Sequence, residues 1–231
     1  MKSHLCLSLI CVSVLLPSTA LAGKGGSSDR PEWGGLGYMT QGWAIGDIGG
    51  TGESLAAAPN MGLLLGGGGM ALLGGRVVLG GQGYALHGLG GGDDALDVQV
   101  SGGGGGFHLG FAAINDHNDL IYPYVGAAFH GHDVLLANGH LPTSIAGVEL
   151  EPGQRDALTG GGGSLDLGVT MFRLFWGDES GGMALGASLG GWIPLTSETW
   201  SAESGAATTV DSTLGGLYLR VNVGGGGAFR G

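Results

Sequence analysis

The segment from Gly181 to Leu195 alternates between large apolar and small residues at nearly every second position. Successive side chains of a β-strand point to opposite faces, so a period of two predicts a strand rather than a helix. The two faces are Met183, Leu185, Leu189, Ile193 and Leu195 against Gly182, Ala184, Gly186, Ser188 and Gly190. The segment is longer than the roughly 9 to 11 residues with which a β-strand crosses a bilayer. It therefore predicts a membrane-crossing strand with an apolar outer face.

Seven other segments are predicted as strands by similar patterns. The full set is 36–48, 61–73, 76–87, a strand within 97–114, 120–136, 164–176, 181–195 and 213–229. Long connections follow the first, third, fifth and seventh of these strands, and short ones follow the others; the longest are 137–163 and 197–212. Bacterial outer-membrane barrels alternate in this way between short periplasmic turns and longer external loops. The pattern predicts an all-β, eight-stranded antiparallel up-and-down transmembrane barrel.

Glycine is the most unusual feature of the composition, with 55 residues out of 231. In a closed eight-stranded barrel the interior is only wide enough for side chains to fill it. Inward glycines would relieve crowding and permit strand curvature. One alternative is that they leave a water-filled conduit or a ligand cavity. Another is that the strand assignment fails around Gly66–Gly69 and Gly102–Gly106.

The first 22 residues have the features of a secretory signal peptide. Lys2 precedes an apolar run from Leu5 to Leu16, and Ala20 and Ala22 form a small-residue cleavage site. We predict cleavage after residue 22, a disordered lead at 23–35 and a barrel domain at 36–229. Both cysteines of the chain lie within the predicted signal peptide, so the mature chain would have no disulfide and no thiolate metal site.

The charge balance is acidic, with 8 Lys and Arg against 19 Asp and Glu and a formal net charge of −11. A chain of this charge repels nucleic acid, so a nucleic-acid partner is excluded. No cofactor-binding motif stands out from the glycine-rich background, and none is predicted.

Asp166, Arg220 and Tyr218 fall on predicted inward faces. A charge on the lipid side of a barrel is costly, which favours the interior. The sequence does not decide whether Asp166 and Arg220 pair. If they do, they either plug and rigidify the lumen or form a charged constriction that selects solutes.

Histidines form the densest polar cluster, with His130 and His132 on one strand face and His108 on the preceding strand. Three imidazoles on one surface would suit Zn²⁺. Two histidines alone are a weak signal, so we interpret all three as polar lining and predict no metal site.

A serine hydrolase also needs a nucleophile within reach of its base, and no such spacing is present. We therefore expect that the protein is not an enzyme.

The aromatic residues that would form interfacial belts are Trp43, Tyr122, Tyr124, Trp176 and Trp192, although Tyr124 would equally fill the interior.

Together, the signal peptide and the alternating strands from Leu36 to Phe229 resemble the small outer-membrane β-barrel proteins of Gram-negative bacteria, the OmpA- and OmpX-like class. The resemblance rests on pattern and implies an outer-membrane location, with membrane lipid and the barrel-assembly machinery as partners. It implies no oligomeric state.

The expected function is a non-enzymatic barrel with a structural, surface-interaction or small-solute pore role. One alternative is a soluble secreted or periplasmic glycine-rich β-protein that self-associates or binds an apolar ligand, because the oily faces would also suit a sandwich core. A second alternative is an outer-membrane barrel lipid hydrolase.

Overall fold

A computed structural model of the chain describes residues 33–47, 60–89, 96–115, 118–138, 143–145, 148–150, 152–178, 181–196, 198–202, 207–210 and 215–227. All regular secondary structure in these residues is β-strand. No helix among them is long and apolar enough to cross a membrane. The predicted signal peptide and most of the predicted lead lie outside the described residues.

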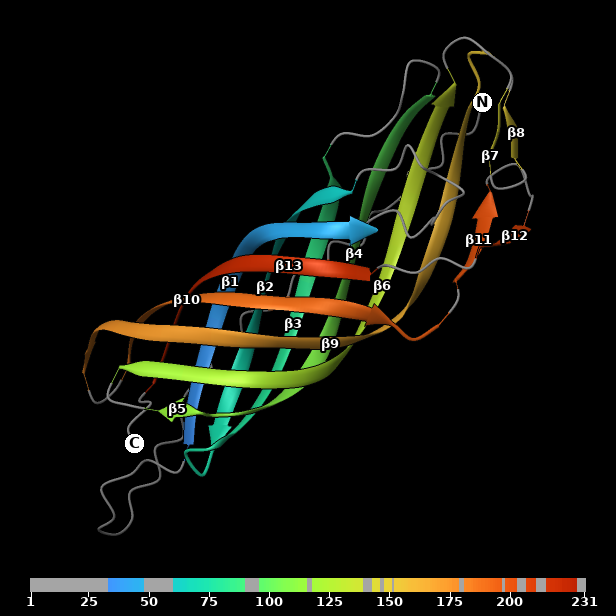
Figure 1. Ribbon diagram of the computed structural model, residues 1–231. Coiled ribbons are helices and arrows are strands. Elements are labelled where there is room, and N and C mark those ends of the chain that lie inside the picture. Colours follow the sequence, from blue (N-terminus) through green and yellow to red (C-terminus); the bar gives the residue numbers. More distant parts are fainter. Residues whose placement is uncertain are drawn as a thin grey trace, which may run out of the picture.

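Eight long strands form the wall of a closed antiparallel barrel (Figure 1). They are β1 (Trp33–Asp47), β2 (Met61–Leu73), β3 (Val77–Gly88), β4 (Leu96–Phe111), β6 (Asp119–Asn138), β9 (Arg155–Asp178), β10 (Gly181–Pro194) and β13 (Gly215–Gly227). Each pairs with its neighbours in this order, and β13 pairs back with β1. The predicted eight-stranded antiparallel barrel is confirmed.

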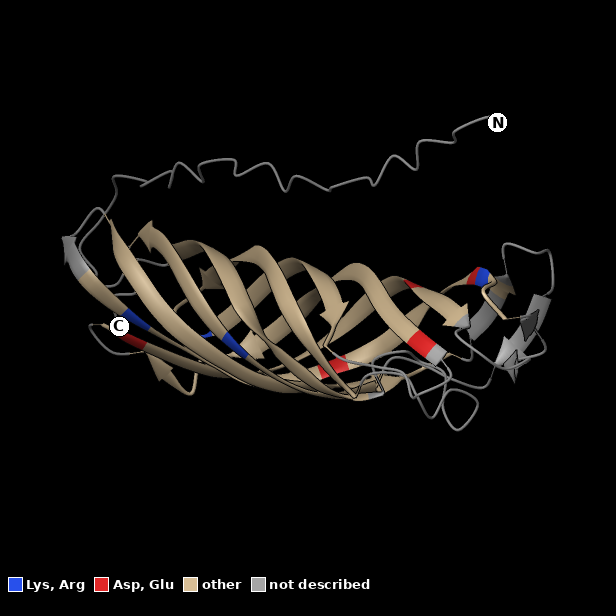
Figure 2. Ribbon diagram, turned by 90° about the horizontal axis from the view of Figure 1, so that it is seen from above, with Lys and Arg blue, Asp and Glu red and all other residues tan. Residues whose placement is uncertain are grey.

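The strands are staggered around the barrel. A row of directly paired residues that leaves β1 at Leu36 passes through all eight strands and returns to β1 at Gly46, ten residues further along. Such a stagger requires the strands to tilt against the barrel axis. Figure 2 shows this tilt, and also that most of the wall carries no charged residue.

The sixth predicted strand differs most from the structure. β9 begins at Arg155 and not at Ser164, because residues 155–163 continue the ladder with β6. The polar, glycine-rich start of this strand lacks the alternation by which strands are recognised in a sequence. β6 and β9 consequently run beyond the ends of β3 and β10 on the side of the long connections (Figure 1).

Five short strands occupy segments predicted as connections or strand ends. β5 (Ile114–Asn115) pairs with β6, and β7 (Thr143–Ile145) pairs with β8 (Val148–Leu150). β11 (Glu198–Ala202) pairs with β12 (Ala207–Val210) and also with two residues of β9 near its start. The predicted loops 137–163 and 197–212 therefore contain regular structure.

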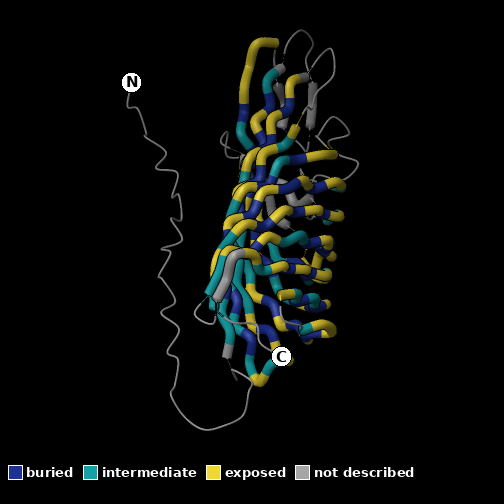
Figure 3. The backbone as a smooth tube through the Cα atoms, turned by 90° about the vertical axis from the view of Figure 1, so that its left-hand side faces the viewer, coloured by how far each residue is buried: buried dark blue, intermediate teal, exposed yellow. Residues whose placement is uncertain are grey.

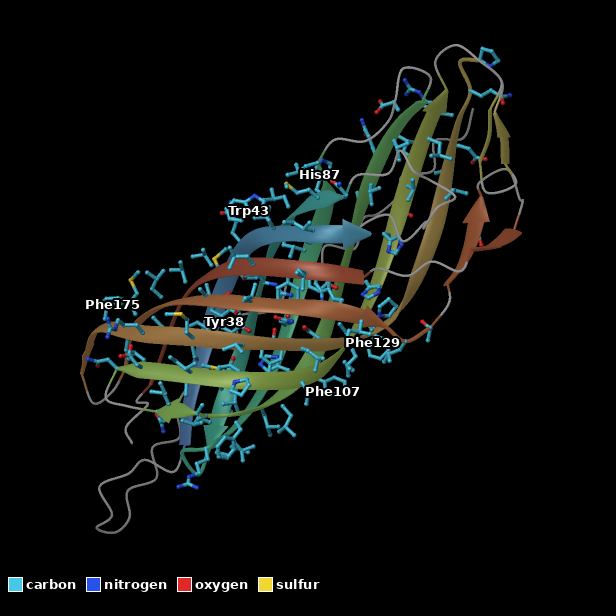
Figure 4. The ribbon with its side chains drawn as sticks, viewed as in Figure 1. Tyr38, Trp43, His87, Phe107, Phe129 and Phe175 are labelled. Atoms are coloured by element: carbon cyan, nitrogen blue, oxygen red, sulfur yellow. The ribbon has the colours of Figure 1, made fainter. Side chains whose placement is uncertain are left out.

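Outside the glycine tracts of β2, β3 and β4, burial alternates along the barrel strands (Figure 3). The apolar face predicted for 181–195 points outward, since Leu189 is 61% exposed. Trp43 is also outside, whereas Tyr38 lies within the barrel (Figure 4). The expectation that Tyr122 and Trp192 belong to interfacial belts is wrong. Both side chains, with that of Tyr124, are buried inside, because the parity of their positions matches the inward face.

Many inward glycines lie beneath the aromatic ring of a residue on a nearby strand. A Cβ at Gly168 would stand 2.7 Å from the hydroxyl of Tyr124, and one at Gly104 would stand 2.9 Å from the hydroxyl of Tyr84. Gly68 has the same relation to Tyr38 at 2.8 Å. These rings use the space that the absent side chains leave, which supports the interpretation that the glycines relieve crowding.

We expect Gly168→Val to destabilise the barrel by about 1–3 kcal/mol, because the added side chain collides with the Tyr124 ring. Gly37→Val is the matched control, since a Cβ at Gly37 meets nothing within 4 Å. Denaturant titration of the purified variants measures both effects. Equal stabilities for the two variants would contradict the packing role of Gly168.

Candidate functional site

The barrel interior is apolar at the end with the short turns. Leu120 and Phe172 are at most 1% exposed and pack there with Tyr122. The full cluster is Leu36, Tyr38, Met70, Leu72, Val78, Ala112, Leu120, Tyr122, Tyr124, Phe172 and Ala184. Side chains of this size meeting in a narrow barrel form an apolar plug, the name used below for this cluster.

Next to the apolar plug, the interior holds a hydrogen-bonded polar network. The Asp166 carboxylate accepts a hydrogen bond from Gln82 Nε2 at 2.9 Å and another from the Tyr218 hydroxyl. Arg220 donates through Nη1 to Gln82 Oε1, and the Tyr124 and Tyr218 hydroxyls are hydrogen bonded to each other. Gln82 therefore joins the two charged side chains, and the pairing that the sequence left open is indirect.

The network ties together strands that are distant along the wall. Asp166 comes from β9, Gln82 from β3, Tyr124 from β6, and Tyr218 and Arg220 from β13. Asp166 is 3% exposed and Arg220 is 2% exposed. Buried charges are tolerated only when they are compensated and hydrogen bonded. The network thus holds opposite sides of the barrel in one arrangement.

Aromatic rings surround the Arg220 guanidinium. Its Cζ lies 3.7 Å from the centroid of the Tyr218 ring, 5.6 Å from that of Trp192 and 5.7 Å from that of Tyr84. A cation near a ring face is stabilised by the ring quadrupole. The Tyr84 and Trp192 rings stack with centroids 5.3 Å apart, although β3 and β10 stand four strands apart in either direction around the wall. The stacked pair therefore spans the lumen.

A second set of polar side chains lies on β9, β10 and β13. The Ser188 hydroxyl is hydrogen bonded to the Thr170 hydroxyl at 2.9 Å and accepts from Asn222 Nδ2 at 2.8 Å. All three residues are buried. Neither partner is a base of the kind that activates a serine nucleophile, so the contacts of Ser188 are structural.

The three predicted histidines are all buried but do not gather at one place. The His108 ring lies 4.9 Å from the Tyr124 ring, next to the polar network. The rings of His130 and His132 are 6.3 Å apart, further toward the long connections. His108 pairs with Gly126 on β6, four residues before His130. Within the described residues, no group of three His, Cys, Asp or Glu side chains could hold a metal ion.

Gln82 and Tyr84 are not among the predicted lumen residues. Gln82 lies among glycines in the run Gly80–Gly83, and Tyr84 follows it at the next inward position. The signal that identifies them is parity, because both fall on the buried face of β3. Asp166, Arg220, Tyr218, His108, His130 and His132, the six predicted lumen residues, all have buried side chains.

No family model matches the chain. No curated protein matches it either. Among solved structures, it is similar to a major outer membrane protein from Thermus thermophilus, with 10% identity and a TM-score of 0.47 over 84% of this chain and 98% of that one. It is also similar to the outer membrane protease OmpT from Escherichia coli, with 7% identity and a TM-score of 0.40 over 88% of this chain and 98% of that one.

We expect Asp166→Asn and Arg220→Met each to destabilise the barrel by about 3–5 kcal/mol, since each leaves a buried charge without its counter-charge. The double variant should be destabilised by less than the sum of the two single destabilisations. Denaturant titration checks both. Asp119→Asn is the control, because its ion pair with Arg173 at 2.8 Å is exposed, and little change is expected. Additive losses would show that Gln82 does not couple the two charges.

Proposed function

We propose that the protein is a non-enzymatic outer-membrane β-barrel with a structural and surface-interaction role. The observation that carries this proposal is the distribution of polarity, which is opposite to that of a soluble protein. Large apolar side chains cover the outside, including Met39 at 68% and Phe107 at 65% exposure. The charged network lies inside. A closed barrel also leaves no unpaired strand edge in its wall, as lipid requires.

This apolar surface is bordered by polar residues at both ends of the barrel. At the short-turn end, Arg173 and Asp119 form their exposed ion pair. At the other end, directly paired positions form an exposed polar row across four strands, and Asp133 accepts a hydrogen bond from Thr159 at 2.7 Å. The row is His87, Ser101, Asp133 and Thr159. An apolar band between two polar boundaries is the outer surface expected of a membrane barrel.

The packed interior favours a structural role over a small-solute pore. The apolar plug occupies one end, and the stacked rings of Tyr84 and Trp192 span the lumen beyond it. The soluble alternative would need another layer over the outward apolar faces. The lipid-hydrolase alternative is disfavoured for His130 and His132, whose side chains are buried on the inner face of β6 and away from lipid.

Residues 96–100 of β4 also lie beyond the last pair that β4 forms with β3. Together with the ends of β6 and β9 they form an extension beyond the wall, which supports the surface-interaction role. Its outer face carries exposed polar side chains, among them Asp97, Gln99 and Asp133. We propose that this part stands outside the cell and meets the partners of the protein. Membrane lipid would surround the wall, and the barrel-assembly machinery would insert it.

The test of the membrane location is gel mobility of the protein from an outer-membrane fraction, with and without boiling in mild detergent. We expect the mobility to change on boiling, because the closed barrel resists detergent until it is heated. Recovery in the soluble fraction with unchanged mobility would overturn the proposal.

We also expect no stepwise conductance when the protein is reconstituted in a planar bilayer, because the apolar plug closes the lumen. Leu120→Ala combined with Phe172→Ala removes two of the largest fully buried side chains of that plug and should raise the leak. Discrete open channels in the unmodified protein would contradict the structural role and support the pore.

A further inference from the structure

Gln41 is a polar side chain in the middle of an apolar surface. It is exposed on the outer face of β1, between Met39 and Trp43 along the strand. The residues paired directly with it on the two adjacent strands are Leu65 of β2 and Val221 of β13. These four side chains are 44–68% exposed, and the Gln41 amide makes no hydrogen bond within the described part of the chain.

An amide in this position lacks a partner in hydrocarbon. The side chain offers two N–H donors and one carbonyl acceptor, and lipid tails can satisfy neither. In bundles of transmembrane helices, amide side chains form hydrogen bonds across helices, and a lipid-facing amide on a barrel wall has the same need for a partner. This reasoning rests on the proposed membrane location, because in water the same amide would be solvated.

We propose that the face around Gln41 is a self-association surface and that its occupant is a second copy of this chain. A carboxamide is complementary to itself, since each copy can both donate and accept. A two-fold axis along the membrane normal and close to Gln41 places the two amides together and keeps both barrels in the same orientation. Two equivalent hydrogen bonds then satisfy both copies.

The shape of the face agrees with this arrangement. On the β2 side of Gln41 the outward positions Gly67 and Gly69 have no side chains, and on the β13 side Val221 and Val223 project outward. The two-fold axis brings the β2 side of one copy against the β13 side of the other. Leu65 of one copy then lies against Val221 of the other, and Val223 meets the glycine positions, which lets the two walls approach closely enough for the amides to bond.

Cysteine cross-linking in the membrane tests the proposal directly. Gln41→Cys is placed in a chain whose Cys6 and Cys11 are replaced by Ser, and the membranes are treated with a mild oxidant. Val125→Cys is the matched control, because Val125 is also outward and 46% exposed but lies on β6, four strands from β1. We expect at least tenfold more disulfide-linked dimer from Gln41→Cys. Equal yields, or no dimer from Gln41→Cys, would overturn the proposal.

Removal of the amide gives a second measurement. We expect Gln41→Leu to weaken dimerisation roughly tenfold in energy-transfer experiments between labelled copies in vesicles. Gln99→Leu is the control, because Gln99 is exposed on the extension of β4, outside the apolar band, and its loss should leave dimerisation unchanged. Equal effects of the two substitutions would contradict a specific role for Gln41.

The mobility shift on boiling separates the two possible failures. If the Gln41 variants shift and remain in the outer-membrane fraction but form no dimer, only self-association is refuted. If neither the shift nor the membrane fraction is observed, the proposed membrane location fails as well.

Discussion

Closure of the β1–β13 ladder is the constraint on which the rest of this structure depends. The two strands pair continuously from Gly35 with Gly227 to Asp47 with Gly215. Without this ladder, both edges of an eight-stranded sheet would present unpaired N–H and C=O groups, which hydrocarbon cannot satisfy. The register of closure also sets the stagger, which decides which side chains meet inside the barrel.

Glycine and aromatic residues work as pairs in the interior. A narrow barrel has little room for large side chains on every strand, yet an empty lumen would lose the stabilisation that packed side chains provide. Tyr38, Tyr84 and Tyr124 resolve the conflict by lying across Gly68, Gly104 and Gly168. The high glycine content thus accompanies a well-filled barrel, and the hydroxyl of Tyr124 also takes part in the polar network.

Sequence reasoning identified the wall but not the connections within the interior. Period-two patterns are physical consequences of a two-sided wall, so the strand number and the inward or outward position of most residues could be derived from them. The link between Asp166 and Arg220 through Gln82 could not, because it spans β3, β9 and β13 and depends on the stagger. Trp192 does not lie at the membrane interface, because the parity of its position, and not its residue type, sets the face to which it belongs.

The first part of β9 gives the molecule a mechanical property. Residues 155–163 continue beyond the last pair that β9 forms with β10, a length of up to roughly 30 Å along the strand. The ladder with β6 has no break between this extension and the wall. A pull on its outer end therefore loads many hydrogen bonds in shear at once, and the extension would transmit tension into the barrel without first unzipping.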